Sequence, residues 1–325
     1  MLDKVADSTC AEYEFSRAEK RDIKALAQKY GSHDFYRDPA CEHEEFCANF
    51  AAVTSAGLYE LLASMSEGRG PDVLVLKDVP IDTPLPDFGG LDQNVAAKGR
   101  ISETVLSGLT ALMKAKLQRE PSSHQPDFLQ QIYPVDEFGN ESSGRGRAPL
   151  PFHAENVFLQ TPPSFLALLC LQGQSGVFTE YLPVADVLDR LTPENLEQLQ
   201  APIYSVRSGD GFQARALDET PVLDAIANGW TISRIYEEDR IQTRDPAGRS
   251  AVHALKSAIV EAKASCVRSV EMTSGTGLLI ANGVAKGRYG GVLHGRKGQI
   301  APETPSTPIG ARRWLQRACI EIKYL

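Results

Sequence analysis

The stretch Pro151-Phe152-His153-Ala154-Glu155-Asn156-Val157-Phe158 places an imidazole and a carboxylate two residues apart in a largely apolar run. This run predicts a β-strand over 150–159, and alternate residues of a strand point to the same face of a sheet. We therefore expect His153 and Glu155 to project together, with their apolar neighbours available for packing. Two such side chains supply much of a catalytic metal site, and a third ligand can come from a distant part of the chain.

The third ligand is predicted among the downstream histidines. His294, in the run Val292-Leu293-His294-Gly295-Arg296, is the best candidate. His253 is an alternative, although its apolar, helix-like surroundings at 251–255 favour a structural role. A His-x-Glu pair alone is a weak signal because it often occurs by chance. The assignment therefore depends on the rest of the chain.

From residue 127 onward, short apolar or alternating runs are separated by turn residues, as is typical of a β-sandwich or jelly roll. Helical segments at 184–199 and from Ser250 to about Lys263 interrupt these runs. The predicted strands are Phe128–Tyr133, Leu150–Leu159, Phe165–Leu171, Val177–Leu182, Ile203–Val206, Thr231–Tyr236, Gly277–Ala281 and Ala318–Tyr324.

The N-terminal third is predominantly helical by its periodicity. Ser16 to Glu19 reads as a capping box, and the helix that follows ends at Gly31. Further helices are expected over 44–64 and 102–117, with a short buried strand at Val73–Leu76 and a loop over 80–100. We expect one domain over residues 1–325, with a helical layer at 1–125 packed on a mainly β core at 126–325.

Composition and charge narrow the class of protein. The chain has 325 residues, of which 42% are hydrophobic and 23% charged, as in an ordinary globular protein. Its net charge of −8 argues against general nucleic-acid binding, which needs a basic surface. The sequence shows neither an N-terminal targeting signal nor an apolar run long enough to cross a membrane. We therefore expect a cytoplasmic enzyme with no membrane partner.

The six cysteines are scattered along the chain, and several lie in apolar runs where a thiol acts as a small hydrophobe. We expect them to be reduced. Cys41, His43 and Cys47 are close in sequence, but no second pair of ligands follows at the usual zinc-site spacing. They are interpreted as helix-surface and core residues.

Together, the segments 150–155, 163–171, 293–296 and 313–317, the last reading Arg-Trp-Leu-Gln-Arg, resemble the clavaminate-synthase-like branch of iron(II)- and 2-oxoglutarate-dependent oxygenases within the taurine dioxygenase superfamily. This branch includes the arginine and asparagine β-hydroxylases. The resemblance covers roughly residues 125 to 325 well and the N-terminal helices loosely. It implies a double-stranded β-helix, or jelly roll, as the core of the fold.

The resemblance assigns roles to named residues. It makes His153, Glu155 and His294 the ligands of Fe(II), a set that leaves three metal positions open for 2-oxoglutarate and dioxygen. Arg313 matches the arginine that binds the distal carboxylate of 2-oxoglutarate, and a guanidinium suits a carboxylate because it can bond bidentately. Arg317 would support it, and Thr179 would assist 2-oxoglutarate binding.

The register near the C-terminus is less certain from the sequence. The connection from Asn282 to His294 is long and glycine-rich, and the stretch from His294 to Arg313 contains additional Pro and Thr residues. Arg312 and Arg317 therefore remain alternatives to Arg313 as the carboxylate ligand.

The substrate is predicted by the same resemblance to be a free L-amino acid or a close derivative, and a basic, Arg- or Lys-like one is favoured. Gln131 and Ser143 occupy plausible positions for its backbone end, Ser143 within the Gly-rich segment 137–147. Glu238 and Asp239 lie in the expected lid and could receive a basic side chain. Alternatively, the acidic lid is a solvated turn and 137–147 is a plain surface loop.

The expected reaction is hydroxylation, with 2-oxoglutarate converted to succinate and CO2. Halogenases of this superfamily have a small residue at the position that Glu155 occupies here. The presence of Glu155 therefore favours hydroxylation. Alternatives are the same cofactor chemistry on a carrier-bound amino acid or another small acid, or desaturation. A further alternative is a non-catalytic β-sandwich scaffold in which His153, Glu155 and His294 never meet. The oligomeric state is left open, with a homo-oligomer among the alternatives.

Overall fold

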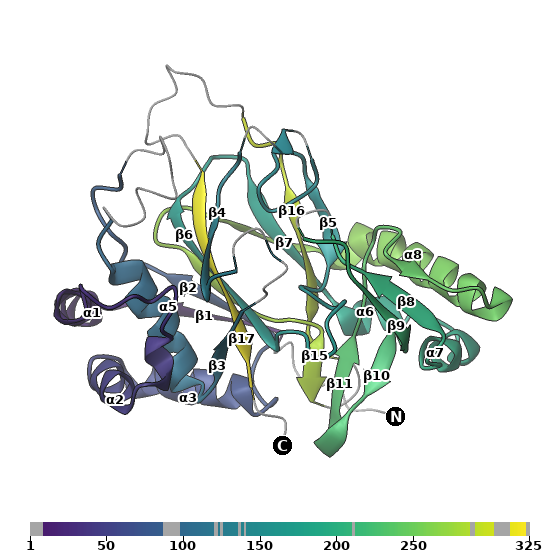
Figure 1. The fold of residues 1–325 in the computed structure, drawn as a ribbon, viewed down its shortest axis with the longest axis horizontal. Coiled ribbons are helices and arrows are strands. Elements are labelled where there is room, and N and C mark those ends of the chain that lie inside the picture. The colour runs from purple at the N-terminus through teal and green to yellow at the C-terminus, as the bar shows by residue number, and fades with distance from the viewer. Residues whose placement is uncertain are drawn as a thin grey trace.

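Two β-sheets face one another at the centre of the protein, and helices cover their outer sides (Figure 1). The structure, a computed structural model, describes residues 9–86, 98–119, 123, 126–135, 138–139, 141–209, 212–286, 290–301 and 313–322.

The larger sheet has seven strands and spans both ends of the chain. Neighbouring strands within this sheet run antiparallel, except that β1 and β2 run parallel to each other. In order across the sheet, the strands are β1 (Cys10–Glu14), β2 (Val73–Lys77), β14 (Gly277–Ala281), β6 (Phe165–Gln172), β17 (Trp314–Glu321) and β3 (Lys116–Gln118), with β4 (Leu129–Ile132) also paired to β17.

The smaller sheet has four antiparallel strands, in the order β13 (Arg268–Glu271), β7 (Phe178–Pro183), β16 (Val292–Lys297) and β5 (Leu150–His153). Two three-stranded sheets complete the β structure. One contains β10 (Leu223–Ala225), β11 (Trp230–Ser233) and β15 (Val284–Lys286); the other contains β12 (Ile241–Gln242), β8 (Tyr204–Arg207) and β9 (Ala216–Thr220).

Helices flank the two sheets on opposite sides (Figure 1). The N-terminal group is α1 (Arg17–Lys29), the 3-10 turn η1 (Ala40–Glu42), α2 (Glu44–Ala52), α3 (Ala56–Ser66) and α5 (Ile101–Leu112). Beyond the smaller sheet lie α6 (Val184–Leu188), α7 (Pro193–Leu199) and α8 (Pro246–Cys266), while the 3-10 turn η4 (Ala227–Gly229) leads into β11.

Strand β2 shows how the layers are built from the sequence. Leu74 and Leu76 pack into the core shared with the N-terminal helices, whereas Val73 and Val75 pack into the core between the two sheets. This is the alternation expected of a strand buried on both faces. A third core joins the smaller sheet to α6, α7 and α8. The protein is thus layered as helices, sheet, sheet and helices, and the inner layer is where a site can be enclosed.

The predicted mainly β chain with added helices is confirmed, and most differences lie at the ends of elements. The expected capping box is present, because Ser16 Oγ accepts from Glu19 N and Glu19 Oε2 accepts from Ser16 N. The predicted helix at 44–64 is instead two helices, because Ser55 caps the start of α3 by accepting from Leu58 N. The end of the predicted helix at 102–117 lies in strand β3. The predicted strand at 318–324 extends past the described residues.

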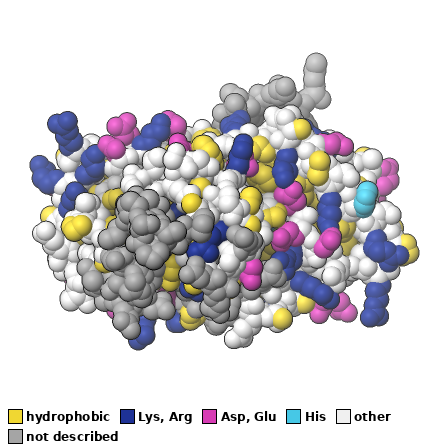
Figure 2. Space-filling model, turned by 90° about the horizontal axis from the view of Figure 1, so that it is seen from above, with side chains coloured by type: hydrophobic (Ala, Val, Ile, Leu, Met, Phe, Trp, Pro, Cys, Tyr) yellow, Lys and Arg dark blue, Asp and Glu magenta, His cyan; other side chains and the backbone are white. Residues whose placement is uncertain are grey.

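The surface carries charges of both signs. Lys, Arg, Asp and Glu side chains are interspersed over the face shown in Figure 2. No helix in the described part of the chain is long and apolar enough to cross a membrane.

Candidate active site

A cavity between the two sheets collects most of the residues that the sequence singled out. His153 ends β5 and His294 lies on the neighbouring strand β16, where the two residues are register partners. With Glu155, they offer three ligand atoms that all lie within 4.8 Å of one another. The structure therefore brings the predicted triad together. This contradicts the scaffold alternative, in which the three residues never meet.

The way Glu155 reaches the site differs from the prediction. Strand β5 ends at His153, and Glu155 lies in the turn that follows, where Asn156 has a positive φ of 52°. Alternation along a strand therefore does not place His153 and Glu155 together. The backbone of Glu155 is instead held by Asn282, which is fully buried. Asn282 Oδ1 accepts from Glu155 N at 2.5 Å, and its Nδ2 donates to Glu155 O at 2.9 Å.

Asn282 was not predicted to be a site residue. Its side chain also donates to Pro163 O at 2.9 Å, so it joins two segments more than 100 positions away in sequence. In effect it supplies the backbone partners that a neighbouring strand would have given Glu155. Its only sequence signal is an asparagine directly after the apolar strand β14, and that signal is too common to be specific.

The imidazole of His153 is oriented for metal binding. Its Nδ1 lies 2.9 Å from the carbonyl oxygen of Pro151. Donation from Nδ1 to this carbonyl leaves Nε2 unprotonated, as in histidine ligands of metals generally. Burial, reinforced by the nearby His294, lowers the pKa of His153 to about 4. The neutral, ligating form therefore prevails at neutral pH. The ring also lies parallel to that of Tyr236, with centroids 6.3 Å apart.

Glu155 is held as a carboxylate despite its burial. Burial alone would raise its pKa, but the Arg317 guanidinium and the two histidines outweigh this effect and lower the pKa well below its usual value. Arg317 Nη1 lies 3.1 Å from Glu155 Oε1, and Glu155 Oε2 lies 3.7 Å from His294 Nε2. Arg317 is itself fixed by Gln130, whose Oε1 accepts from its Nε at 2.8 Å. Arg317 thus positions the Glu155 carboxylate.

Arg313 occupies a different place in the same cavity. Its side chain is buried and lines the cavity, and its Nη1 has no hydrogen-bond partner within the described residues. Burial lowers its pKa to about 10, so it remains a cation at neutral pH. An unpaired buried cation is costly unless an anion joins it. Thr179, on β7, is also buried and lines the cavity. These two residues fit the carboxylate end of an oxoacid.

Arg317 lies on β17 and Arg313 directly precedes that strand, so the alternation of the chain places both on one face. Leu315, between them, packs in the core between the sheets, while Trp314 and Ala318 pack toward the N-terminal helices. Arg313 and Arg317 therefore both point into the cavity. The alternative carboxylate ligand Arg312 lies outside the described residues.

Arg296, next to His294 in the sequence motif, holds the glycine-rich segment over the cavity. Its Nη2 donates to the carbonyl oxygens of Ser143 at 3.2 Å and Gly146 at 3.0 Å, and also to that of Ala148. Burial, followed by the nearby Arg313, lowers the pKa of Arg296 to about 9. Ser143 accordingly lines the cavity, as a substrate-binding residue would.

Gln131 does not line the main cavity. It lies on β4 and lines a smaller cavity that shares Ile132, Ser143 and Arg317 with the main one. Its Oε1 accepts from Trp314 Nε1 at 2.7 Å and its Nε2 donates to the Tyr36 hydroxyl at 3.0 Å. The structure therefore gives Gln131 a bracing role behind β17, and its predicted contact with substrate stays a prediction.

The acidic lid residues are separated by the fold. Glu238 lines the cavity, but Arg240 Nε donates to its Oε2 at 3.1 Å. Asp239 does not line the cavity: its side chain is 95% exposed and pairs with Lys256 of α8. Its predicted role as a substrate contact is therefore not supported by its position. The histidine alternative His253 lies on the exposed side of α8 and is likewise outside the cavity.

These residues fit an iron(II) centre with an oxoacid beside it. Two imidazoles and one carboxylate form a facial set of the kind used by non-haem iron oxygenases. The buried, unpartnered Arg313 meets the need of a carboxylate ligand. The fold and the site together define a mainly β protein with an enclosed two-histidine, one-carboxylate centre.

Comparison with known proteins finds curated relatives of this chain. No protein-family model matches the chain. L-asparagine oxygenase of Streptomyces coelicolor is 26% identical over 313 residues, covering 92% of this chain and 86% of that protein. Enduracididine beta-hydroxylase of Streptomyces hygroscopicus is 29% identical over 132 residues, covering 39% of this chain and 38% of that protein.

Solved structures share the fold along nearly the whole chain. Asparagine oxygenase in complex with Fe(II), 2S,3S-3-hydroxyasparagine and succinate superposes with a TM-score of 0.76 at 20% identity, covering 95% of this chain and 92% of that chain. The non-haem iron oxygenase OrfP in complex with Fe and alpha-ketoglutaric acid superposes with a TM-score of 0.73 at 18% identity, covering 96% and 95%. The predicted resemblance to the arginine and asparagine β-hydroxylase branch is confirmed.

Proposed function

We propose that this protein is an Fe(II)- and 2-oxoglutarate-dependent dioxygenase that hydroxylates a free L-amino acid, with succinate and CO2 as co-products. The observation that carries the proposal is the enclosed triad with Arg313 buried and unpartnered beside it. The relatives support it, because their names and complexes specify amino-acid hydroxylation with iron, 2-oxoglutarate and succinate.

His153, Glu155 and His294 hold Fe(II), and Arg313, with Thr179 beside it, binds the distal carboxylate of 2-oxoglutarate. When bound, Fe(II) and 2-oxoglutarate supply the dioxygen activation and the oxidising power for attack on an unactivated C–H bond. The protein's part is positioning and exclusion of water. Arg317 fixes Glu155 through one carboxylate oxygen, and Arg296 keeps the segment around Ser143 over the cavity.

We further propose that the two facing sheets are the halves of a double-stranded β-helix and that residues 1–325 form one oxygenase domain, with the N-terminal layer at 1–125 and the core at 126–325. The shared inner core of the sheets and their long antiparallel pairings support this. Strands β1, β2 and β3 of the N-terminal part extend the larger sheet. Cytoplasmic location stays a prediction from the sequence.

The side chain of the substrate is the least determined feature. Glu238 is the acidic lid residue that lines the cavity, and Arg240 neutralises part of its charge. A basic side chain would therefore have to compete with Arg240 for Glu238. The preference for an Arg- or Lys-like substrate thus rests on this one carboxylate, and an amide such as asparagine needs no such exchange.

The test is an assay with Fe(II), 2-oxoglutarate, air and a panel of L-amino acids led by Arg, Lys and Asn. Mass spectrometry should find a product heavier by one oxygen atom, with succinate formed in equal amount. Succinate without such a product would favour a carrier-bound or modified substrate. A product lighter by two hydrogen atoms would indicate desaturation. No succinate with any substrate would overturn the proposal.

A further inference from the structure

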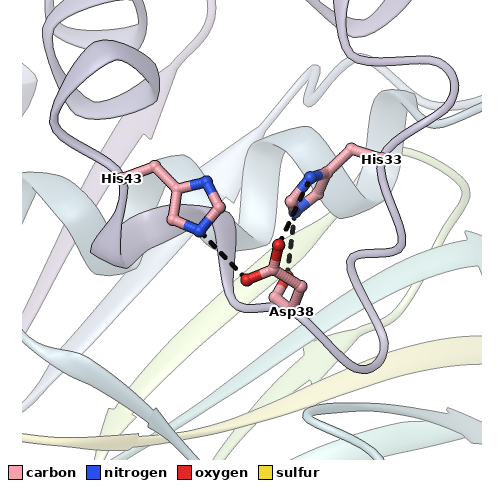
Figure 3. Close-up of side chains that lie close together, drawn as sticks. All are labelled: His33, Asp38 and His43. Carbon is pink, nitrogen blue, oxygen red and sulfur yellow. Dashed lines mark hydrogen bonds and ion pairs between the residues drawn. The ribbon is translucent and has the colours of Figure 1, made fainter.

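A second group of metal-ligating side chains lies in the segment between α1 and α2. His33, Asp38 and His43 point toward one another (Figure 3), and their ligand atoms all lie within 4.8 Å. None of the three lines the cavity that contains the triad. Their side chains are 15%, 53% and 46% exposed, so the group is open to ions from solvent.

The ring of His33 is held in an orientation suited to ligation. Its Nε2 lies 2.9 Å from the carbonyl oxygen of Asp38, and its Nδ1 lies 3.8 Å from Asp38 Oδ2. A hydrogen bond from Nε2 to the carbonyl leaves Nδ1 unprotonated, so that Nδ1, which faces the carboxylate, can bind a metal ion. The rings of Phe35 and Tyr30 pack edge-on against it, at centroid distances of 4.8 and 6.5 Å.

His43 is placed by the start of α2. It is the N-cap residue of that helix, yet its side chain makes no capping hydrogen bond and turns instead toward Asp38. His43 Nε2 lies 3.0 Å from Asp38 Oδ1. Neighbouring ligand atoms of a tetrahedral zinc ion are about 3.3 Å apart, given bonds of about 2.0 to 2.1 Å. The distances of 3.0 Å from His43 Nε2 to Asp38 Oδ1 and 3.8 Å from His33 Nδ1 to Asp38 Oδ2 lie on either side of that value, so each imidazole faces its own oxygen of the carboxylate.

We propose that His33, Asp38 and His43 form a second metal site, for zinc or a chemically similar divalent transition metal, separate from the iron centre. Two imidazoles with one carboxylate favour such ions over Mg²⁺ and Ca²⁺, which prefer all-oxygen ligands. A fourth position is left to water. The nearby Cys41 and Cys47 are not ligands of this site, because Cys41 is buried and the Cys47 thiol is directed at the Cys41 carbonyl.

A metal ion bound by these three residues holds the connection between α1 and α2 in place. This connection carries Tyr36, whose hydroxyl accepts from Nε2 of both Gln131 and Gln316 at 3.0 and 3.1 Å. It also donates to Glu103. Metal at the second site therefore stabilises the segment that braces β4 and β17 from behind. Without metal, the same residues are joined by the contacts of His43 Nε2 with Asp38 Oδ1 and of His33 Nε2 with the Asp38 carbonyl oxygen, which is the rival explanation.

The test separates this site from the triad by removing the latter. In the full-length His153→Ala/His294→Ala protein, competition of Zn²⁺ against a chromophoric chelator should show one bound zinc per chain. Adding Asp38→Asn or His43→Gln should weaken zinc binding by at least about tenfold, since even loss of an outer hydrogen bond to a ligand costs ten- to hundredfold. His253→Gln, an exposed histidine on α8, is the matched control and should change nothing.

Both new substitutions are at exposed positions, and circular dichroism checks that each variant is folded. If the triad-disabled background does not fold, the wild-type chain is used instead, and His43→Gln should lower its zinc content from two ions to one. Absence of zinc from the triad-disabled chain, or zinc binding unaffected by both substitutions, would overturn the proposal. The inference uses no residue of the proposed active site, so failure of either leaves the other standing.

Discussion

Two regions of this protein carry the same donor groups in different settings. Each brings two imidazoles and one carboxylate to within 4.8 Å, one between the sheets and one in the connection between α1 and α2. In the buried group, Glu155 has a cationic partner in Arg317 and a backbone partner in Asn282. In the exposed group, Asp38 faces the two histidines themselves. The two groups therefore contain the same types of side chain, but they differ in the contacts that hold the carboxylate and in how deeply they are buried.

This difference separates catalysis from simple binding. A reactive metal centre needs a dry cavity, open metal positions and a site for a second reactant. The triad lines a cavity, and the same cavity contains Arg313, whose Nη1 has no hydrogen-bond partner in the described part of the chain and can bind a second reactant. The surface group has an open position facing water and stabilises a loop.

Replacing His294 by Ala should abolish succinate formation, because Fe(II) loses one of its three protein ligands. The measurement is succinate by mass spectrometry with Fe(II) in excess. His253→Ala, on the exposed side of α8, should leave turnover unchanged. Full activity in the His294 variant would show that the triad is not the iron site.

Replacing Arg313 by Ala should raise the KM for 2-oxoglutarate roughly ten- to 150-fold, since hydrogen bonds to charged groups contribute about 1.5 to 3 kcal/mol. The KM for the amino acid should change little. Arg313→Lys keeps the charge but loses the planar fork and should recover only part of the affinity. An unchanged KM for 2-oxoglutarate would mean that a residue other than Arg313 binds its distal carboxylate.

Replacing Asn282 by Ala should weaken Fe(II) binding about ten- to hundredfold, although Asn282 touches no metal ligand atom. The reason is that the turn carrying Glu155 loses two of its backbone hydrogen bonds. Asn282→Asp is the informative comparison, because aspartate accepts from Glu155 N but cannot donate to Glu155 O. Iron affinity should be measured directly by chelator competition. Equal affinity in both variants and the wild type would mean that the turn is positioned by other contacts.

Replacing Asp38 by Asn should leave kcat for hydroxylation essentially unchanged, because Asp38 does not line the cavity that contains the triad. The effect should appear in stability. In the His153→Ala/His294→Ala protein, Zn²⁺ at 100 times its dissociation constant should stabilise the fold by about 2.7 kcal/mol, and this gain should vanish when Asp38→Asn is added. A large loss of kcat in iron-loaded Asp38→Asn would mean that the two regions are coupled.

The sequence predicted the parts of the molecule that depend on local patterns. The capping box of α1 and the buried strands β6 and β14 were read from spacing and apolar runs, and all three are present. Strand β1 was not predicted, since its residues Cys10–Glu14 are half exposed and carry two glutamates at an edge of the sheet. Its strand conformation depends on pairing with β2, which lies 59 or more residues away in sequence.

The sequence predicted which residues meet in the cavity, but it did not predict the contacts that hold them there. His153, Glu155, His294 and Arg313 could be chosen from a resemblance of motifs. The turn that presents Glu155 could not, because Asn282 acts on it from 127 positions away. Likewise, the neutralisation of Glu238 by Arg240 depends on side-chain orientation that no sequence pattern specifies.

Strand β17 has a bearing on how new substrate ranges could evolve. Its inward Arg317 and the preceding Arg313 line the cavity, while its outward side chains Trp314 and Gln316 are hydrogen-bonded to Gln131 and Tyr36. Substitution on either side disturbs a committed partner, so this strand has little freedom to vary. Laboratory evolution of the enzyme should therefore target the cavity residues on the connections outside the two central sheets, such as Phe212, Glu238 and Arg240. Diversity there can reshape the substrate end and leave the oxidising end intact.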